Sequence, residues 1–69
     1  MSQNYAYNYA ILDLSTGMCM EVRSCTYEIN DPSCIEIPVY DEEYILKYYI
    51  NGRWYEDAAG TIPWTSSLI

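Results

Sequence analysis

Large residues alternate with small or polar ones along most of the chain. Between positions 5 and 14, one face carries large residues and the other mostly small or aliphatic ones. The large residues are Tyr5, Tyr7, Tyr9 and Ile11. Successive side chains of a β-strand point to opposite faces, so this period of two predicts a strand. Gly17 then predicts a turn with a left-handed residue, and positions 18–23 alternate again. The sequence therefore predicts a first β-hairpin.

A strict alternation in the returning strand would place Met18, Met20 and Val22 on one face and Cys19, Glu21 and Arg23 on the other. Residues 24–33 leave two options open, a short strand or an irregular crossing. The alternation returns at 34–40, but Pro38 lies inside it. Proline donates no backbone hydrogen bond, so Pro38 predicts either an edge strand or the point where the strand leaves the sheet.

A second hairpin is predicted at Asn51-Gly52, which lies between large apolar residues. Both central residues of a type I′ turn need a positive φ, which Asn and Gly adopt most easily. The register that follows pairs Ile50 with Arg53, Tyr49 with Trp54, Tyr48 with Tyr55, and Lys47 with Glu56. Each face of this ribbon then carries an aromatic pair, which stabilises paired strands.

Asp41 and the acidic residues after it predict one helical turn at most, near 41–46, because a capping carboxylate and acids in the first turn suit a helix start. With turn signals roughly every ten residues, the expected fold is mainly β: a small antiparallel meander of about four or five short strands. Residues 1–69 are expected to form a single small domain.

The chain contains nine Tyr, two Trp and no Phe. Tyrosine tolerates one wet end, so these rings suit either a small sheet with covered faces or a protein–protein surface. For the second option, the candidate interface residues are Tyr5, Tyr7, Tyr48, Trp54 and Tyr55. A domain of this size has little core, so we expect a homo-oligomer, a dimer or a trimer.

Ten acidic residues against three basic ones give a formal net charge of -7. Phosphate-backbone binding and anionic membrane surfaces both require basic residues, so we expect neither nucleic acid nor membrane as a partner. A basic partner protein stays open, and so does the simpler option that the acidity keeps a tyrosine-rich sheet soluble. No signal-peptide pattern or long apolar run is present, which predicts a soluble protein made in the cytoplasm.

Candidate chemistry is sparse. The chain has three Cys, no CxxC motif and no His, so we expect free thiols in a reducing compartment, with no metal site and no Cys-His or Ser-His pair. The carboxylates at 41–43 and 56–57 flank turns and are more typical of a solvated edge than of acid–base catalysis. We therefore predict no enzymatic activity, no catalytic residues and no cofactor.

Four segments in order, 9–13, 17–22, 35–44 and 47–57, resemble small uncharacterised proteins encoded in prophages of gut Firmicutes, in the neighbourhood of tail-fibre and lysis genes. The most specific piece is Tyr-x-Asn-Gly-x-Trp at 49–54. The resemblance implies a non-enzymatic phage accessory or tail-associated virion protein, made in the host cytoplasm and acting through contacts with another phage structural protein. It carries over no site residues. The alternative is a phage-encoded inhibitor of a host defence system or host enzyme, an acidic decoy that binds a basic host protein.

Overall fold

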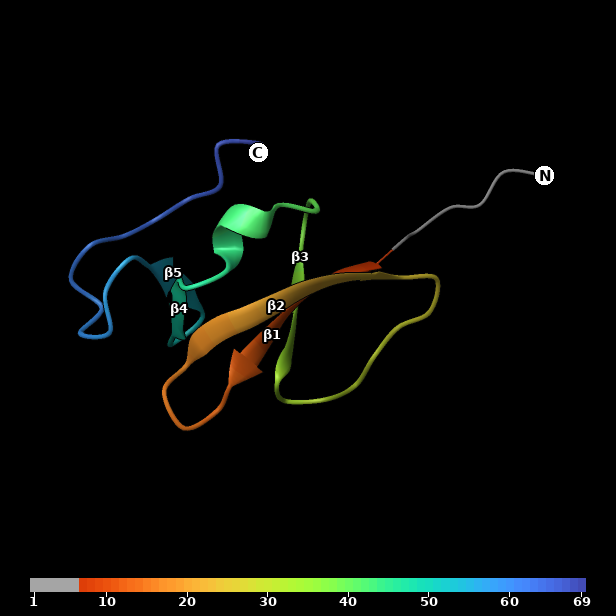
Figure 1. Ribbon diagram of the computed structural model, residues 1–69, viewed down its shortest axis with the longest axis horizontal. Coiled ribbons are helices and arrows are strands. Elements are labelled where there is room, and N and C mark those ends of the chain that lie inside the picture. The colour runs from red at the N-terminus through yellow and green to blue at the C-terminus, as the bar shows by residue number, and fades with distance from the viewer. Residues whose placement is uncertain (1–6) are drawn as a thin grey trace.

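The computed structural model describes residues 7–69, whose strands form one antiparallel sheet (Figure 1). The strands are β1 (Tyr7–Asp13), β2 (Met18–Cys25), β3 (Cys34–Ile37), β4 (Tyr48–Ile50) and β5 (Arg53–Tyr55), with the 3-10 turn η1 (Glu42–Tyr44) between β3 and β4. The predicted mainly β class, with two hairpins and one helical turn capped by Asp41, is confirmed. The order in the sheet is β3-β1-β2-β4-β5, so the strands are not neighbours in chain order throughout, as the predicted meander requires.

The sheet order departs from the chain order because β3 pairs with the outer edge of β1. The chain leaves β2 and runs as a wide loop, on the right of Figure 1, before it returns as β3. This loop packs on Tyr9, whose hydroxyl accepts a hydrogen bond from the Ile29 amide at 2.8 Å. Residues 24–33 are thus the end of β2 followed by an irregular crossing. β3 is an edge strand and ends directly before Pro38, so both expectations for that proline hold.

The predicted alternation along β2 is wrong because the strand contains a β-bulge. Ile11 pairs with Glu21 but Leu12 pairs with Cys19, so Met20 is an extra residue opposite β1. Beyond an inserted residue, each side chain of the strand points to the face opposite to the one that strict alternation predicts. Cys19, which is fully buried, and Val22, which is 8% exposed, therefore both lie in the same core instead of on opposite faces.

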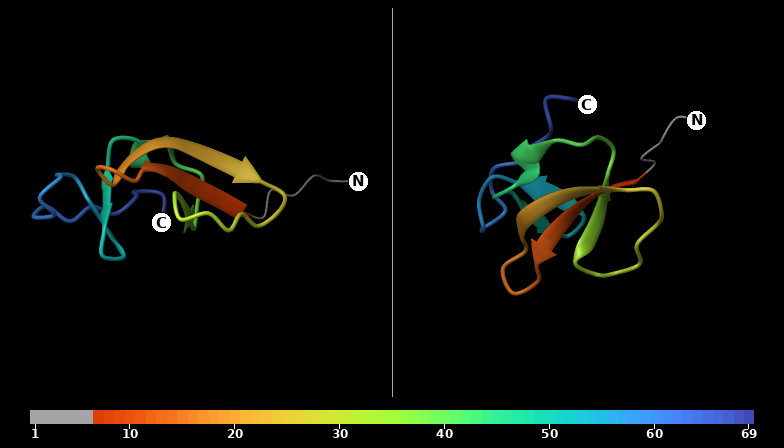
Figure 2. Two further views of the ribbon diagram at one scale, coloured as in Figure 1. Left: turned by 90° about the horizontal axis from the view of Figure 1, so that it is seen from below. Right: turned by 45° about the vertical axis from the view of Figure 1, so that its right-hand side comes forward.

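The second hairpin forms as predicted and stands at a steep angle to β1 and β2 (Figure 2). Asn51 and Gly52 have φ of 50° and 81°, and the predicted pairs from Ile50–Arg53 to Tyr48–Tyr55 are all present. Lys47 lies beyond this register. Its ammonium nitrogen lies 5.0 Å from the centroid of the Trp64 ring, which is a cation–π contact in place of the expected pair with Glu56.

Replacing Asn51 tests this turn. We expect Asn51→Ala to lower the free energy of unfolding by about 1 kcal/mol or more, because alanine resists a positive φ. Asn51→Gly is the matched control, since glycine adopts that conformation freely, and it should cost much less. Urea unfolding followed by tryptophan fluorescence gives both values. Equal losses in the two variants would contradict the turn assignment.

The buried core lies between the sheet, η1 and the C-terminal segment. Its members are Ala10, Leu12, Cys19, Val22, Ile37 and Tyr44, with Ile35, Ile45, Tyr49, Trp54 and Trp64 packed against them. The opposite face of the second hairpin is covered too. A Cβ built on Gly60 would lie 3.2 Å from Cδ1 of Ile50 and 3.8 Å from the Tyr55 ring, so the loop after β5 packs on this face. Loops therefore cover rings that the sheet alone would leave exposed.

Part of the acidity has a local structural role. Asp13, Asp31 and Asp57 each accept hydrogen bonds from backbone amides two to five residues further on, which closes a turn. The Ser15 hydroxyl and amide lower the pKa of Asp13, the Ser33 amide and hydroxyl lower the pKa of Asp31, and the Thr61 hydroxyl with the Ile62 amide lowers the pKa of Asp57. Because the folded pKa lies below the unfolded one, each carboxylate stabilises the fold at neutral pH, and this contribution is lost as the pH falls through the lowered pKa.

Candidate functional site

A groove of about 400 Å³ lies between the two ends of the sheet. It is lined by residues 36–38 at the end of β3, by all of β5, by 63–66 of the C-terminal segment, and by Tyr44 and Ile69. In a flat sheet β3 and β5 would lie four strand spacings, roughly 19 Å, apart. Both strands border one groove because the sheet curls and the C-terminal segment runs back past η1 (Figure 1).

The groove is built on three aromatic side chains that contact one another edge-to-face. The Tyr44 ring lies 4.9 Å from the Trp54 ring and 4.8 Å from the Trp64 ring, with interplanar angles of 72° and 82°. These are edge-to-face contacts, which aromatic pairs favour. Tyr44 is 2% exposed, whereas both tryptophans are half-buried and line the groove. Burial, and then the charge of Asp41, raises the pKa of the Tyr44 phenol above its ordinary value.

A buried polar contact holds the C-terminal wall of the groove against η1. The Asp41 carboxylate accepts a hydrogen bond from the Glu43 amide at 2.9 Å and, on its other oxygen, a short one from the Ser66 hydroxyl. Asp41 is 6% and Ser66 is 3% exposed. The next residue, Ser67, donates to the Glu43 carboxylate at 3.4 Å. The acidic start of η1 therefore lies directly behind the wall formed by the C-terminal segment.

Two oppositely charged side chains line the groove. Glu36 comes from β3 and Arg53 from β5, and both are exposed. In the part of the chain that the structure describes, the one ion pair joins Arg23 to Glu21, so neither groove charge is used in a salt bridge there. Both charges are available to a ligand.

The predicted interface residues do not gather on one surface. Trp54 and Tyr55 line the groove, and Tyr48 lies opposite Tyr55 on β4 but outside the lining. Tyr7 is on β1, where its ring stacks on Tyr9 with the centroids 6.4 Å apart. Tyr5 lies outside the described residues.

Sequence reasoning missed Tyr44, Trp64 and Ser66, which complete the groove. Tyr44 ends the short helical turn, and the other two belong to a C-terminal segment that carries no alternation. The signal that was available is Pro63-Trp64, because a large aromatic residue after a proline, in a chain with only two tryptophans, marks a packed extended segment rather than a loose end.

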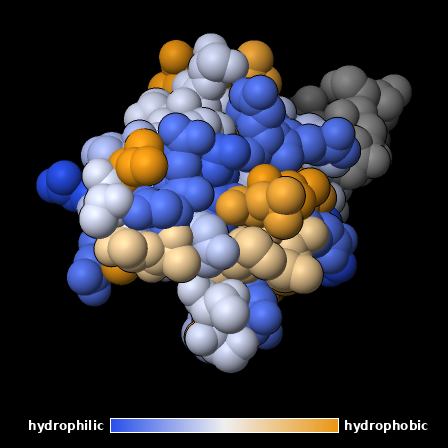
Figure 3. Space-filling view, turned by 60° about the vertical axis from the view of Figure 1, so that its left-hand side comes forward, coloured by the Kyte–Doolittle hydropathy of each residue, from blue (hydrophilic) through white to orange (hydrophobic). Residues whose placement is uncertain are grey.

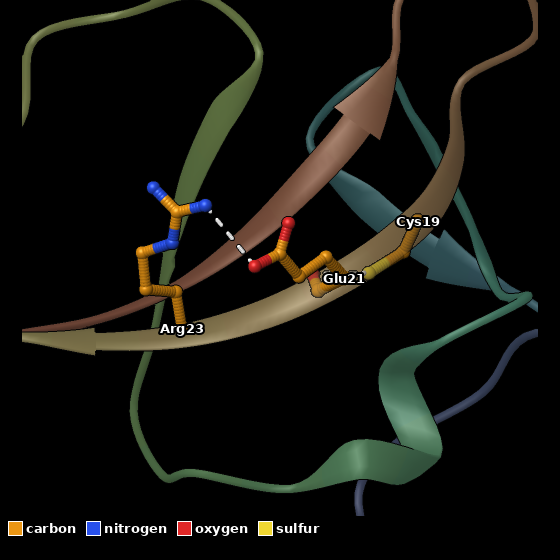
Figure 4. Close-up of polar contacts among 3 residues, drawn as sticks. All are labelled: Cys19, Glu21 and Arg23. Atoms are coloured by element: carbon orange, nitrogen blue, oxygen red, sulfur yellow. Dashed lines mark hydrogen bonds and ion pairs between the residues drawn. The ribbon is translucent and has the colours of Figure 1, made fainter.

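A second candidate site lies on β2, where Cys19, Glu21 and Arg23 occupy every second position (Figure 4). The Arg23 guanidinium donates to the Glu21 carboxylate at 3.1 Å, with side-chain exposures of 53% and 51%. An exposed pair of this kind contributes little to stability. The Cys19 thiol donates instead to the Glu21 backbone carbonyl at 3.3 Å, and burial raises the pKa of the thiol. Cys19 is therefore a packed, protonated thiol and not a reactive one.

Hydrophobic residues on the face in Figure 3 form separate groups between hydrophilic ones. No set of three or more His, Cys, Asp or Glu side chains within the described range is placed to hold a metal ion. Likewise, the described residues include no helix of the length and hydrophobicity needed to cross a membrane.

Comparison with known proteins found no matching family model, and neither the curated proteins nor the solved structures gave a significant match.

Proposed function

We propose that this protein is a non-enzymatic binding protein that contacts another protein through its aromatic groove. We place it, as the sequence resemblance implies, among phage accessory or tail-associated virion proteins made in the host cytoplasm. The observation that carries the binding role is the groove itself, a hollow of about 400 Å³ whose lining includes the half-buried Trp54 and Trp64. Aromatic side chains in a concave site are typical of protein–protein anchors and ligand pockets.

The polar groups at the groove favour binding over catalysis. Ser66 has its hydroxyl engaged with the Asp41 carboxylate, and both residues are buried. Asp41 is in turn the cap of η1, so this pair holds two segments together. The chain has no His to serve as a general base near pH 7. Glu36 and Arg53 suit electrostatic orientation of a partner, which acts on specificity and encounter.

Proteomics of purified phage particles after prophage induction tests the proposed virion role. We expect the protein to copurify with particles through a density gradient, at a constant ratio to known tail proteins. An abundant host cytosolic protein serves as the contamination control. Absence from particles, together with salt-sensitive capture of one basic host protein, would overturn the virion role in favour of the acidic decoy.

Self-association forms part of the proposal. A 69-residue domain buries little apolar surface, and among residues 7–69 eight large hydrophobic side chains are at least 45% exposed, including Leu14, Met20, Tyr27 and Leu46. We expect a dimer or trimer in light scattering coupled to gel filtration at micromolar concentration, with a Tm that rises with concentration. A monomer of 8.1 kDa with a concentration-independent Tm would contradict this expectation.

A further inference from the structure

We propose that the groove binds an extended, proline-rich peptide segment that carries a basic residue. The proposal rests on the binding function above and specifies the partner's chemistry. It is carried by three properties of the groove: its aromatic and proline lining, its position at the open seam of a curled sheet, and the distribution of charge around it.

The lining suits a polyproline II segment. The half-buried Trp54 and Trp64 are aromatic residues of the lining, and Pro38 and Pro63 border the groove on opposite sides. Pro-rich peptides dock in aromatic-lined grooves because their rings pack flat on aromatic faces and because the extended helix is already formed before binding. Little conformational entropy is then lost, which allows a small surface to bind a short segment.

The groove also has the shape for an extended chain. One side is formed by residues 36–38 of the edge strand β3, and the other by β5 with the C-terminal segment. The outer edge of β5 is already occupied, because the Trp64 amide donates to the Trp54 carbonyl at 3.0 Å and the Glu56 amide donates to the Ile62 carbonyl at 2.8 Å. A ligand that binds against β5 therefore contacts aromatic rings rather than unpaired backbone N–H and C=O groups. This favours polyproline docking over the addition of a strand to β5.

The charges specify a basic residue and its position. Glu36 lines the β3 side of the groove, and Arg53 lines the β5 side. Both side chains are exposed, so the groove carries a negative charge on one side and a positive charge on the other. A peptide cation is therefore attracted toward Glu36 and away from Arg53, which sets the direction of the chain. A second copy of this protein, with its own net charge of -7, is a poor occupant of the same groove.

The test uses a synthetic peptide of repeated Ala-Pro-Pro units with two arginines at one end, titrated into the intact protein. Because both tryptophans of the chain line the groove, their fluorescence reports binding directly, and calorimetry gives the Kd. We expect saturable binding. Replacing the peptide prolines by glycine, or its arginines by glutamate, should each weaken binding roughly tenfold. No binding, or equal binding of the glycine peptide, would overturn the proposal.

Two protein variants with the same charge change locate the site. Glu36→Lys should weaken peptide binding roughly tenfold, whereas Glu28→Lys, exposed in the crossing loop, should change it less than about twofold. Arg53→Glu should strengthen binding. Both replaced glutamates are exposed, so the fold is retained, which circular dichroism verifies. Equal losses from Glu36→Lys and Glu28→Lys would mean unspecific attraction and overturn the groove assignment.

Peptide binding and the virion role fail separately. If the protein is found in particles but does not bind the peptide, only the proposed proline-rich ligand is overturned. If it binds the peptide but is absent from particles, only the virion role is overturned.

Discussion

Replacing Tyr44 with alanine is expected to lower the free energy of unfolding by about 3–5 kcal/mol, the range for truncating a buried aromatic residue. Tyr44 is 2% exposed and its ring contacts both Trp54 and Trp64 edge-to-face. A domain of this length has a total stability of only about 3–10 kcal/mol, so the variant should be largely unfolded at 37 °C. Thermal unfolding followed by near-UV circular dichroism measures the loss.

Tyr44→Phe is the matched control. It keeps the ring and removes only the hydroxyl, which makes no hydrogen bond with the described residues. We expect a change below about 1 kcal/mol and retained peptide binding. If Tyr44→Phe proved as damaging as Tyr44→Ala, ring packing could not be the main role of this residue, and the account of the groove floor would be wrong.

The second large effect is expected at Asp41. Asp41→Ala removes the cap of η1 and leaves the buried Ser66 hydroxyl without its acceptor, which together should cost about 2–3 kcal/mol. The chain offers a matched control in Asp31, which accepts from the Ser33 amide at 2.9 Å and its hydroxyl at 2.7 Å but is exposed. Asp31→Ala should cost less than about 1 kcal/mol, because water replaces the lost partners.

A double-mutant cycle separates the two contributions of Asp41. Ser66→Ala alone, Asp41→Ala alone and the double variant are compared by urea unfolding. We expect a coupling energy of about 1 kcal/mol between the two sites, since each single change leaves a buried partner unsatisfied. Additive losses would show that the link between η1 and the C-terminal segment contributes nothing beyond the cap.

The parts of the fold that were predictable from sequence depend on neighbours in the chain. The Asn51-Gly52 turn and its register follow from backbone sterics at two residues, and the turn at Gly17 follows from the same rule. The Asp41 cap is also local, since the backbone amide that donates to its carboxylate lies two residues away, at Glu43. In each case the physical cause fits within a few residues, so the pattern is visible in the sequence.

The groove was not predictable because its parts meet only through long-range packing. The bulge at Met20 inverts the faces of β2, and nothing in the side-chain alternation marks an inserted residue. The crossing from β2 to the far side of β1 brings β3 within reach of β5. Ser66 contacts Asp41 across 25 residues of chain. Two of the five predicted interface residues, Trp54 and Tyr55, lie in the groove because the hairpin register placed them correctly on β5.

The most direct test of the groove as the binding surface is an NMR titration of the protein with the arginine-containing proline-rich peptide. The chain has two indole N–H groups, those of Trp54 and Trp64, and both belong to groove residues. We predict that both indole signals shift together with the Glu36 amide, and that the amides of the crossing loop around Glu28 stay in place. Shifts confined to the crossing loop and β1, with both indole signals unmoved, would contradict this account.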